Sequence, residues 1–274
     1  MSGVASGAGS GGTALQRSRE RVLDFGRRLR GRETILGYWV VMDSPISTER
    51  LARIGYDYIC FDGQHGLLDY KGILAGMQAV DAGGESVGLV RVGANDAFLI
   101  GQALDSGAAG IIVPLVNTAE DAARAVSLAK YPPLGIRSYG PMRSQLRIGP
   151  DPADSNAATV VLAMIETPQG LENVEAIART PGIDGLYIGP SDLRIAVGGA
   201  TSSDPAVDDA FEQAVTRILA AAESAGIAAG FHTPNGEVAA RRLAQGFTLA
   251  TVSADLVHLE QAATAHLRVA RGAS

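Results

Sequence analysis

The sequence is constrained most by eight short apolar runs that alternate with longer segments of helical periodicity. The runs are nearly continuous in apolar residues, as expected for parallel strands covered on both faces. A chain of 274 residues with this alternation is typical of one (β/α)8 TIM barrel, which needs about 250 residues. An open doubly wound sheet is the alternative, but it usually has fewer strands and a phosphate loop after the first strand, which we do not find. The predicted strands are residues 35–42, 56–62, 86–92, 110–116, 160–166, 183–189, 227–233 and 247–253.

Helical segments separate these runs throughout the chain. One of them begins at Thr118 and has Asp121 three residues later, close to a capping box. We expect a single barrel domain over residues 14–274 and a disordered tail of small residues over 1–13. The predicted helices are residues 47–55, 95–107, 118–130, 167–180, 208–226 and 238–246.

One segment interrupts the alternation. Residues 131–157 show no apolar period, contain five prolines and precede the fifth predicted strand. Loops of this length in compact domains are usually functional. Arg137 and Arg143 within it are candidates for binding a second anionic group, and a scaffolding role in the loop is the equal alternative.

The composition excludes several classes of function. The net charge of −6 gives no basic stripe for a nucleic acid, and the basic stretch 17–32 also carries acids, so we interpret it as a solvated helix. No apolar stretch approaches the roughly 18–20 residues of a membrane span. The single cysteine, Cys60, lies in an apolar run and cannot form a disulfide within the chain. We therefore expect a cytoplasmic protein with no nucleic-acid or membrane partner.

Two acids stand at strand ends, where TIM barrels place their catalytic groups. Glu166 ends the fifth predicted strand and Asp192 follows the sixth. A carboxylate beside buried strand residues is costly unless it is paired or bound to a metal. Two such acids suit a divalent cation that leaves its other positions to water and substrate. The alternatives are a solvent-facing acid or a helix start for Glu166 and a helix N-cap for Asp192.

Polar side chains also follow the second and third predicted strands. His65 comes three residues after Asp62, and a histidine oriented by a carboxylate is a common general acid or base. A satisfied loop histidine is the alternative for His65. Arg91 ends an apolar run, so it needs an anionic partner: either a substrate or a structural ion pair with Asp62 or another acid.

The remaining histidines and the two lysines narrow the chemistry further. His232, at the end of the seventh predicted strand, is a candidate for a supporting role, and His258 and His266 are interpreted as structural. Lys71 and Lys130 are the only lysines, and neither is expected at the C-terminal end of a strand. A Schiff-base mechanism needs a desolvated lysine there. We therefore expect a metal ion to act as the electron sink.

In their order and spacing these motifs resemble the HpcH/HpaI aldolase family, the class II pyruvate aldolases that include 4-hydroxy-2-oxoheptanedioate aldolase and 2-dehydro-3-deoxyglucarate aldolase. The resemblance extends from about Ile35 to His258 and implies a TIM barrel. The matching stretches are FDGQHGLLDY, VRVGANDAFLIGQALDSGAAGIIVPLV, YPPLGIRSYGPMR, MIETPQGLENVEAI and PGIDGLYIGPSDL.

The resemblance implies a metal site and a proton-transfer group. Glu166 and Asp192 match the ligands of a divalent ion, which would be Mg²⁺, Mn²⁺ or Co²⁺. His65 and Asp62 match a dyad that holds a catalytic water. The implied reaction is the reversible aldol cleavage of a 4-hydroxy-2-oxo acid to pyruvate, or a pyruvate analogue, and an aldehyde.

The resemblance also implies how the 2-oxo acid binds. Arg91 matches an arginine that contacts the keto oxygen. The backbone N–H groups of Ser191 and Asp192, next to Gly189, match a cradle for the pyruvate carboxylate at a helix start, where an anion is favoured. Family members are hexamers built as trimers of dimers, which implies a homo-oligomer here.

Some positions depart from the family pattern. Gln64 stands where many members have Glu, Met164 stands where many have Gln, and GIRSYGPMR replaces a loop that reads GIRG elsewhere. These changes concern the outer pocket, so two alternatives stay open. One is a related enolate enzyme on the same metal site, such as a CoA-ester lyase, a decarboxylase or a macrophomate synthase-like enzyme. The other is a non-catalytic barrel that binds a ligand or serves as a scaffold.

Overall fold

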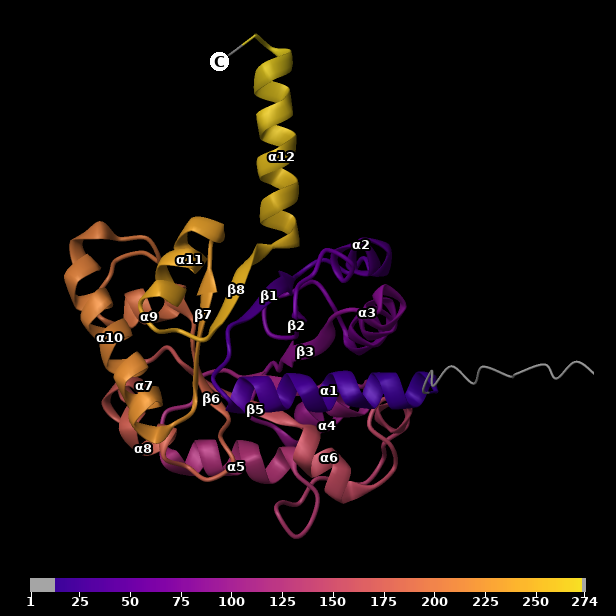
Figure 1. The fold of residues 1–274 in the computed structure, drawn as a ribbon. Helices are drawn as coiled ribbons and strands as arrows, with labels where there is room; N and C mark the ends of the chain where they lie inside the picture. Colours follow the sequence, from indigo (N-terminus) through magenta and orange to yellow (C-terminus); the bar gives the residue numbers. More distant parts are fainter. Residues whose placement is uncertain (1–12, 273–274) are drawn as a thin grey trace, which may run out of the picture.

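The eight strands close into one parallel barrel, in the order β1 to β8 (Figure 1). The computed structural model describes residues 13–272. Each strand pairs in parallel with the next one along the chain, and β8 pairs with β1, so the predicted TIM barrel is confirmed. The strands are β1 Ile35–Val40, β2 Tyr58–Asp62, β3 Val87–Arg91, β4 Gly110–Val113, β5 Val160–Ile165, β6 Gly185–Ile188, β7 Ala228–Thr233 and β8 Leu249–Ala254.

Several strands end earlier than their apolar runs. β4 ends at Val113, although the run continues to Val116, which is buried without belonging to the strand. Neighbouring loops often cover the first residues after a barrel strand. The sequence can therefore stay apolar for a few residues beyond the last hydrogen-bonded residue of the strand. β5 likewise ends at Ile165. Glu166 therefore lies one residue beyond its strand, at the C-terminal end of the barrel.

Alternate residues of each strand form two apolar layers. Tyr58 and Cys60 of β2 belong to the cluster inside the barrel, whereas Ile59 and Phe61 belong to the cluster between strands and outer helices. The buried position expected for Cys60 is confirmed. Gly37 in β1 makes room for the Tyr58 ring, because a Cβ atom at this position would collide with it.

The outer helix α5 starts at the expected capping residue. Thr118 and Asp121 form the predicted capping box of α5. The predicted helix over 167–180 is divided into two short helices at Asn173. The helices are α2 Pro45–Leu51, α3 Tyr70–Gly83, α4 Ala97–Asp105, α5 Ala119–Ala129, α7 Pro168–Glu172, α8 Val174–Ala178, α9 Pro190–Ala196, α10 Asp208–Ala225 and α11 Gly236–Ala244, with the short η2 Pro205–Val207 before α10.

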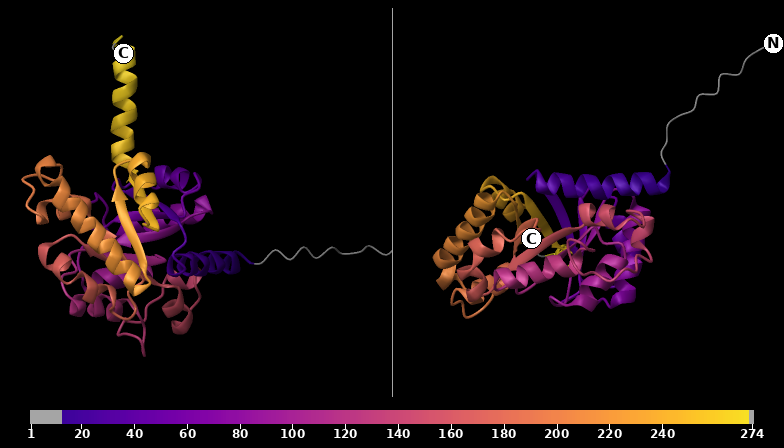
Figure 2. Two further views of the ribbon diagram at one scale, coloured as in Figure 1. Left: turned by 60° about the vertical axis from the view of Figure 1, so that its left-hand side comes forward. Right: turned by 90° about the horizontal axis from the view of Figure 1, so that it is seen from below.

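The basic N-terminal stretch forms α1, Ala14–Arg30, which is not simply solvated as predicted. Val22, Phe25 and Leu29 are buried and belong to the cluster inside the barrel. They recur at the spacing of one helical face, a signal that the charges of the stretch concealed. Thus α1 closes the N-terminal end of the barrel (Figure 2). Thr13 is its N-cap, and the rest of the expected tail lies outside the described residues.

The long segment over 131–157 lies at the end of the barrel opposite the candidate site, because it connects α5 to the start of β5. Arg137 donates a hydrogen bond to Asp105 at 2.6 Å, and Arg143 forms an ion pair with Asp81. These pairs support the scaffolding role for both arginines, so the idea that they bind a second anion near the site is not supported. The segment includes η1 Ser144–Leu146 and α6 Pro152–Ala158.

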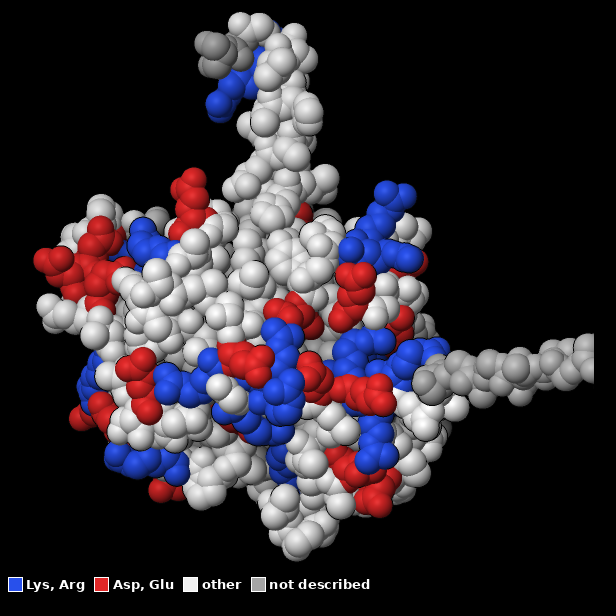
Figure 3. Space-filling model, in the orientation of Figure 1, with Lys and Arg blue, Asp and Glu red and all other residues white. Residues whose placement is uncertain are grey.

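The last helix, α12 Asp255–Ala270, projects away from the barrel (Figures 1 and 2). Every residue from Leu259 to Ala270 is exposed. Its surface is largely uncharged, whereas charges of both signs are mixed over the barrel face in Figure 3. Only the base of the helix is anchored: His258 Nδ1 lies 2.8 Å from the Tyr38 hydroxyl. Within residues 13–272, no helix has the length and apolar character needed to cross a membrane.

Candidate active site

The C-terminal ends of the strands surround a cavity of about 260 Å³. Most of the site residues singled out from the sequence line it, and Glu166 lies behind its Gly189 wall. The residues that the strand-end rule singled out therefore lie together in space. The lining residues are Trp39, Val41, Asp62, His65, Arg91, Met164, Gly189, Pro190, Ser191, Asp192, His232 and Ala254.

Asp62 and Arg91 form a buried ion pair in this cavity. They are the last residues of β2 and β3 and stand opposite each other in the sheet. Arg91 donates from Nε and Nη2 to the two carboxylate oxygens, at 2.9 and 2.5 Å. Burial raises the pKa of Asp62, but Arg91 and the backbone N–H groups of His65 and Gln64 outweigh burial and hold the pKa below its ordinary value. The structural ion pair considered for Arg91 is thus present.

The sequence analysis missed Trp39, which belongs to the same cluster. Its indole Nε1–H donates to Asp62 Oδ2 at 3.2 Å, and the Arg91 guanidinium lies 5.1 Å from the centre of its ring. The ring also stacks on Tyr187, with centroids 6.1 Å apart. The sequence signal that could have identified Trp39 is its position, as an aromatic residue near the C-terminal end of the first predicted strand.

His65 reaches the cavity from the turn after β2, and its side chain is exposed. Its backbone N–H donates to Asp62 Oδ1 at 3.1 Å. Among the hydrogen bonds of the described residues, none joins the His65 ring to the Asp62 carboxylate. His65 and Asp62 are therefore linked through the backbone of the turn and not through their side chains. The Asp62 carboxylate accepts its hydrogen bonds from Arg91, Trp39 and backbone N–H groups.

Glu166 has one satisfied and one unsatisfied carboxylate oxygen. Oε1 accepts a hydrogen bond from the Leu115 backbone at 2.9 Å, whereas Oε2 is buried and has no partner. Gly189 leaves room for this oxygen, because a Cβ atom there would collide with it. Burial raises the pKa of Glu166, and the nearby charge of Asp192 raises it further. The hydrogen bond from the Leu115 amide and the charge of Arg91 lower the pKa but do not outweigh these effects. A cation between the two carboxylates would offset both effects.

Asp192 stands at the start of α9 beside this carboxylate. The N-cap position is Gly189, so the N-cap alternative for Asp192 is not what the structure shows. Its side chain is exposed, and it lies in the first helical turn with Ser191. Backbone N–H groups in a first turn have no acceptor within their own helix. Those of Ser191 and Asp192 are available at the cavity wall.

His232 at the end of β7 packs edge-on against Trp39, with ring centroids 5.0 Å apart. Its Nδ1 atom is buried and has no hydrogen-bond partner. Burial lowers its pKa to about 4, and the charge of Arg91 acts in the same direction, against Asp62. The imidazole is therefore neutral at pH 7, which suits a residue that supports the site by contact and hydrogen bonding.

Both lysines lie away from the cavity. Lys130 donates from Nζ to the carbonyls of Asn156 and Thr159, at 2.7 and 2.5 Å, beside the N-terminal end of β5. Burial lowers its pKa to about 8. Lys71 is exposed in the first turn of α3. Neither amine lines the cavity, so no lysine is placed for a Schiff base with a substrate there.

Known proteins share this fold and this sequence pattern. The model of the family described as HpcH/HpaI aldolase/citrate lyase matches residues 36–262. The chain belongs to this family. The resemblance stated from the sequence motifs is thereby confirmed over most of the chain.

Two curated relatives of this family member are aldolases. The hydroxypyruvate/pyruvate aldolase of Rhizorhabdus wittichii is 37% identical over 234 residues, which cover 85% of this chain and 92% of the relative. The 5-keto-4-deoxy-D-glucarate aldolase of Salmonella paratyphi C is 36% identical over 236 residues, which cover 85% and 90%. The expected class, a class II aldolase acting as a carbon–carbon lyase, is confirmed by the family and these relatives.

Solved structures agree with this assignment. An HpcH/HpaI aldolase/citrate lyase family protein from Burkholderia cenocepacia has a TM-score of 0.81 at 32% identity, covering 90% of this chain and 99% of its own. Macrophomate synthase has a TM-score of 0.79 at 28% identity, covering 93% and 89%. The second protein matches one alternative function considered from the sequence.

His232 should make the stability of this HpcH/HpaI protein depend on pH. Its pKa of about 4 in the folded state lies below the unfolded value of about 6.5. Between these values the unfolded chain binds a proton that the folded protein does not, so stability falls as the pH falls. From pH 7 to pH 5 we expect a loss of up to about 2 kcal/mol from this residue.

Urea unfolding of the wild type and of His232→Gln at both pH values measures this effect. His266→Gln is the matched control, because His266 is exposed on α12. The assignment is wrong if wild type and His232→Gln lose equal stability between pH 7 and pH 5.

Proposed function

We propose that this protein catalyses the reversible, metal-dependent aldol cleavage of a 4-hydroxy-2-oxo acid to pyruvate, or a pyruvate analogue, and an aldehyde. The observation that carries the proposal is the buried, unpartnered Oε2 of Glu166 next to the carboxylate of Asp192. The same cavity holds Arg91 and His65. Acid, arginine and histidine thus meet at one place, which a barrel used only for binding or as a scaffold would not require.

The donor set fits a hard divalent cation such as Mg²⁺, Mn²⁺ or Co²⁺. Within residues 13–272, no group of three or more His, Cys, Asp or Glu side chains forms a metal-binding cluster. Glu166 and Asp192 would therefore supply two carboxylates, and water and substrate would complete the coordination, as is usual for Mg²⁺. The bound ion would supply Lewis-acid polarisation of the substrate's keto oxygen.

Arg91 is placed to stabilise negative charge on the keto oxygen. Its Nε and Nη2 donate to Asp62, which fixes the plane of the guanidinium. Nη1 has no hydrogen-bond partner among the described residues, so it is the donor left for a substrate. A donor held in place before the reaction stabilises developing charge without reorganisation. The free N–H groups of Ser191 and Asp192 would hold the pyruvate carboxylate.

His65 is the residue we assign to proton transfer. Its ring borders the cavity and is exposed to water, whereas the Asp62 carboxylate is occupied by Arg91 and Trp39. Asp62 therefore orients the His65 turn and keeps Arg91 in place, and its low pKa makes it a poor base. A water next to the His65 ring would carry the methyl proton of pyruvate.

Removal of one acid should weaken metal binding. Glu166→Gln keeps the shape of the side chain but removes the charge of the buried oxygen, and Asp192→Asn does the same at α9. We expect Mn²⁺ affinity to fall at least tenfold, which corresponds to about 1.4 kcal/mol, in a folded barrel. Calorimetric titration with Mn²⁺ measures it. Glu175→Gln, on the surface of α8, is the control, and wild-type affinity in either site variant would exclude that residue as a ligand.

Loss of His65 should slow proton transfer without weakening metal binding. His65→Ala is expected to reduce exchange of the pyruvate methyl protons with D₂O by about 10²–10⁴-fold, the usual size of general acid–base effects. NMR follows the exchange, and Mn²⁺ titration of the same variant checks the metal site. His266→Ala serves as the control on α12. Exchange at the wild-type rate in His65→Ala would show that another group transfers the proton.

We also propose that α12 packs against a second copy of this chain within a homo-oligomer, which in this family is expected to be a hexamer. An isolated helix of this length is marginal in water, and twelve exposed residues in succession leave α12 without tertiary support. Leu256, Leu259, Ala263 and Leu267 recur on one helical face. A helix with such an exposed apolar stripe is stable only when another apolar surface covers the stripe. A second copy, with an identical stripe, offers a self-complementary surface.

A charge on this stripe should therefore dissociate the assembly. The double variant Leu259→Glu and Leu267→Glu is expected to lower the mass measured by light scattering to that of a smaller assembly or a monomer. The control is Gln261→Glu with Thr264→Glu, which places the same charge on the other face of α12. A wild type that is already monomeric, or equal masses for both double variants, would contradict the role of α12.

A further inference from the structure

The backbone of Leu115, two residues after β4, adopts a left-handed conformation with a φ of 54°. This region is sterically costly for leucine, whereas glycine enters it without cost. Pro114 ends the strand, because its nitrogen has no hydrogen to donate to a neighbouring strand. Pro114 and Val116 are buried on either side, while the Leu115 side chain is half exposed. A strained residue persists only where the surrounding structure fixes it, and such residues tend to occur at functional sites.

Contacts with β5 and α7 hold the loop just beyond this strained residue. The Val116 N–H donates to the Met164 carbonyl at 3.3 Å, and the side-chain amide of Asn173 donates to the Asn117 carbonyl at 2.8 Å. Gly170 of α7 packs closely on the same loop, because a Cβ atom there would lie 2.6 Å from the Val116 carbonyl oxygen. The loop is therefore fixed to its neighbours, and the left-handed residue cannot relax without breaking these contacts.

The left-handed conformation directs the Leu115 N–H at one oxygen of Glu166. This N–H donates to Oε1 at 2.9 Å. The other oxygen, Oε2, is buried without a partner beside Gly189, and the charge of Asp192 acts on the same carboxylate. The hydrogen bond therefore fixes the plane of the carboxylate, with Oε1 held at the loop. Oε2 is the oxygen left for a ligand.

A carboxylate that offers a single oxygen does not suit all divalent cations equally. Ca²⁺ takes about six to eight oxygen ligands in a flexible geometry and often binds both oxygens of one carboxylate. Mg²⁺ and Mn²⁺ prefer octahedral coordination, in which single carboxylate oxygens and waters suffice. Within residues 13–272, no third acidic, histidine or cysteine side chain joins Glu166 and Asp192 in a metal-binding cluster. The two acids therefore provide few oxygens for the larger ion.

We propose that Leu115 is a positioning residue that sets the cation selectivity of this site: its backbone N–H holds Glu166 Oε1, so that Glu166 binds a metal through Oε2 alone and Ca²⁺ is disfavoured against Mn²⁺ and Mg²⁺. The inference rests on the proposed metal site. The N–H and the left-handed backbone carry this role, and the leucine side chain does not. Exclusion of Ca²⁺ matters for the reaction, because a smaller ion lies closer to a keto oxygen and polarises it more strongly.

An ester in place of the Leu115 amide tests this role, because it removes the N–H and keeps the side chain. The α-hydroxy acid analogue of leucine is introduced at position 115, and calorimetric titration with Mn²⁺ alone and with Ca²⁺ alone gives both affinities. Wild type should bind Mn²⁺ more tightly than Ca²⁺. In the ester protein we expect the ratio of the two affinities to fall by about tenfold, the size typical of groups that orient metal ligands.

Two further variants serve as controls. The same ester at Leu134 removes an N–H that donates to the Tyr131 carbonyl at 3.1 Å, in the segment at the opposite end of the barrel. It should keep the wild-type ratio. Leu115→Gly keeps the N–H and adopts the left-handed conformation without strain, so it should keep the ratio as well. Because the readout is a ratio of two affinities, partial loss of folded protein does not affect it.

A wild-type ratio in the Leu115 ester, or an equal loss in the Leu134 ester, overturns the role of this N–H. Loss of the ratio in Leu115→Gly also overturns it, because the selectivity would then belong to the side chain. The wild type separates this failure from that of the proposed function. Equal affinity for Mn²⁺ and Ca²⁺ contradicts the selectivity alone, whereas no binding of either ion contradicts the metal site and, with it, the role of Leu115.

Discussion

The end of this barrel that holds the candidate active site depends on the buried ion pair between Asp62 and Arg91. Parallel pairing of β2 and β3 places the two residues opposite each other at the last position of each strand. The pair therefore links two strands, and its carboxylate also fixes Trp39 and the turn that carries His65. Loss of one member of a buried pair typically costs about 3–5 kcal/mol, because the other is left as an uncompensated charge. The geometry of the candidate site and local stability therefore depend on the same pair.

Much of the architecture follows from sequence because each barrel strand carries its own local signal. Apolar runs gave all eight strand positions, and the rule for strand ends placed Asp62, Arg91 and Asp192 at one cavity. The errors arose where tertiary position decides. The burial of α1 depends on the barrel end that it closes. The position of the segment over 131–157 could have been predicted, because it follows a predicted helix and precedes a predicted strand, which places it at the N-terminal end of the barrel.

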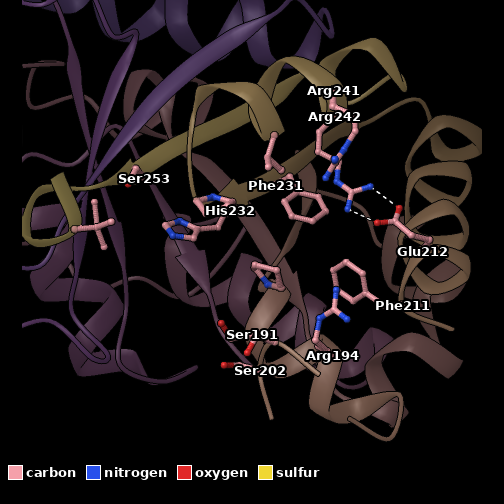
Figure 4. Close-up of a pocket in the computed structure, with 16 residues that line it drawn as sticks. Ser191, Arg194, Ser202, Phe211, Glu212, Phe231, His232, Arg241, Arg242 and Ser253 are labelled. Carbon is pink, nitrogen blue, oxygen red and sulfur yellow. Dashed lines mark hydrogen bonds and ion pairs between the residues drawn. The ribbon is translucent and has the colours of Figure 1, made fainter. Parts of the chain in front are cut away.

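The cavity of about 510 Å³ beside the candidate active site (Figure 4) could not be predicted from the sequence. Its walls combine residues from α9, α10, β7 and α11, which are consecutive elements of the chain but have ordinary helical or strand signals that do not show how they fold together. His232 and Ser191 were the lining residues that the sequence analysis had named. Unpartnered polar atoms, such as Glu166 Oε2 and Ser253 Oγ, also become visible only in three dimensions. Buried polar atoms of this kind cost stability, a local inconsistency that is expected at functional sites.

The base of α12 connects this projecting helix to the walls of the candidate active site. Asp255, the first residue of this helix, accepts hydrogen bonds from the backbone N–H groups of Val41 and Met42, and Val41 lines the candidate active site. Val257, two residues later, lines the neighbouring cavity of about 510 Å³. A contact that fixes the direction of α12 therefore also holds the walls of both cavities in place. If that contact is made by another copy of the chain, mass action links the occupied state of the site to protein concentration, and specific activity would decline on dilution well before the barrel itself unfolds.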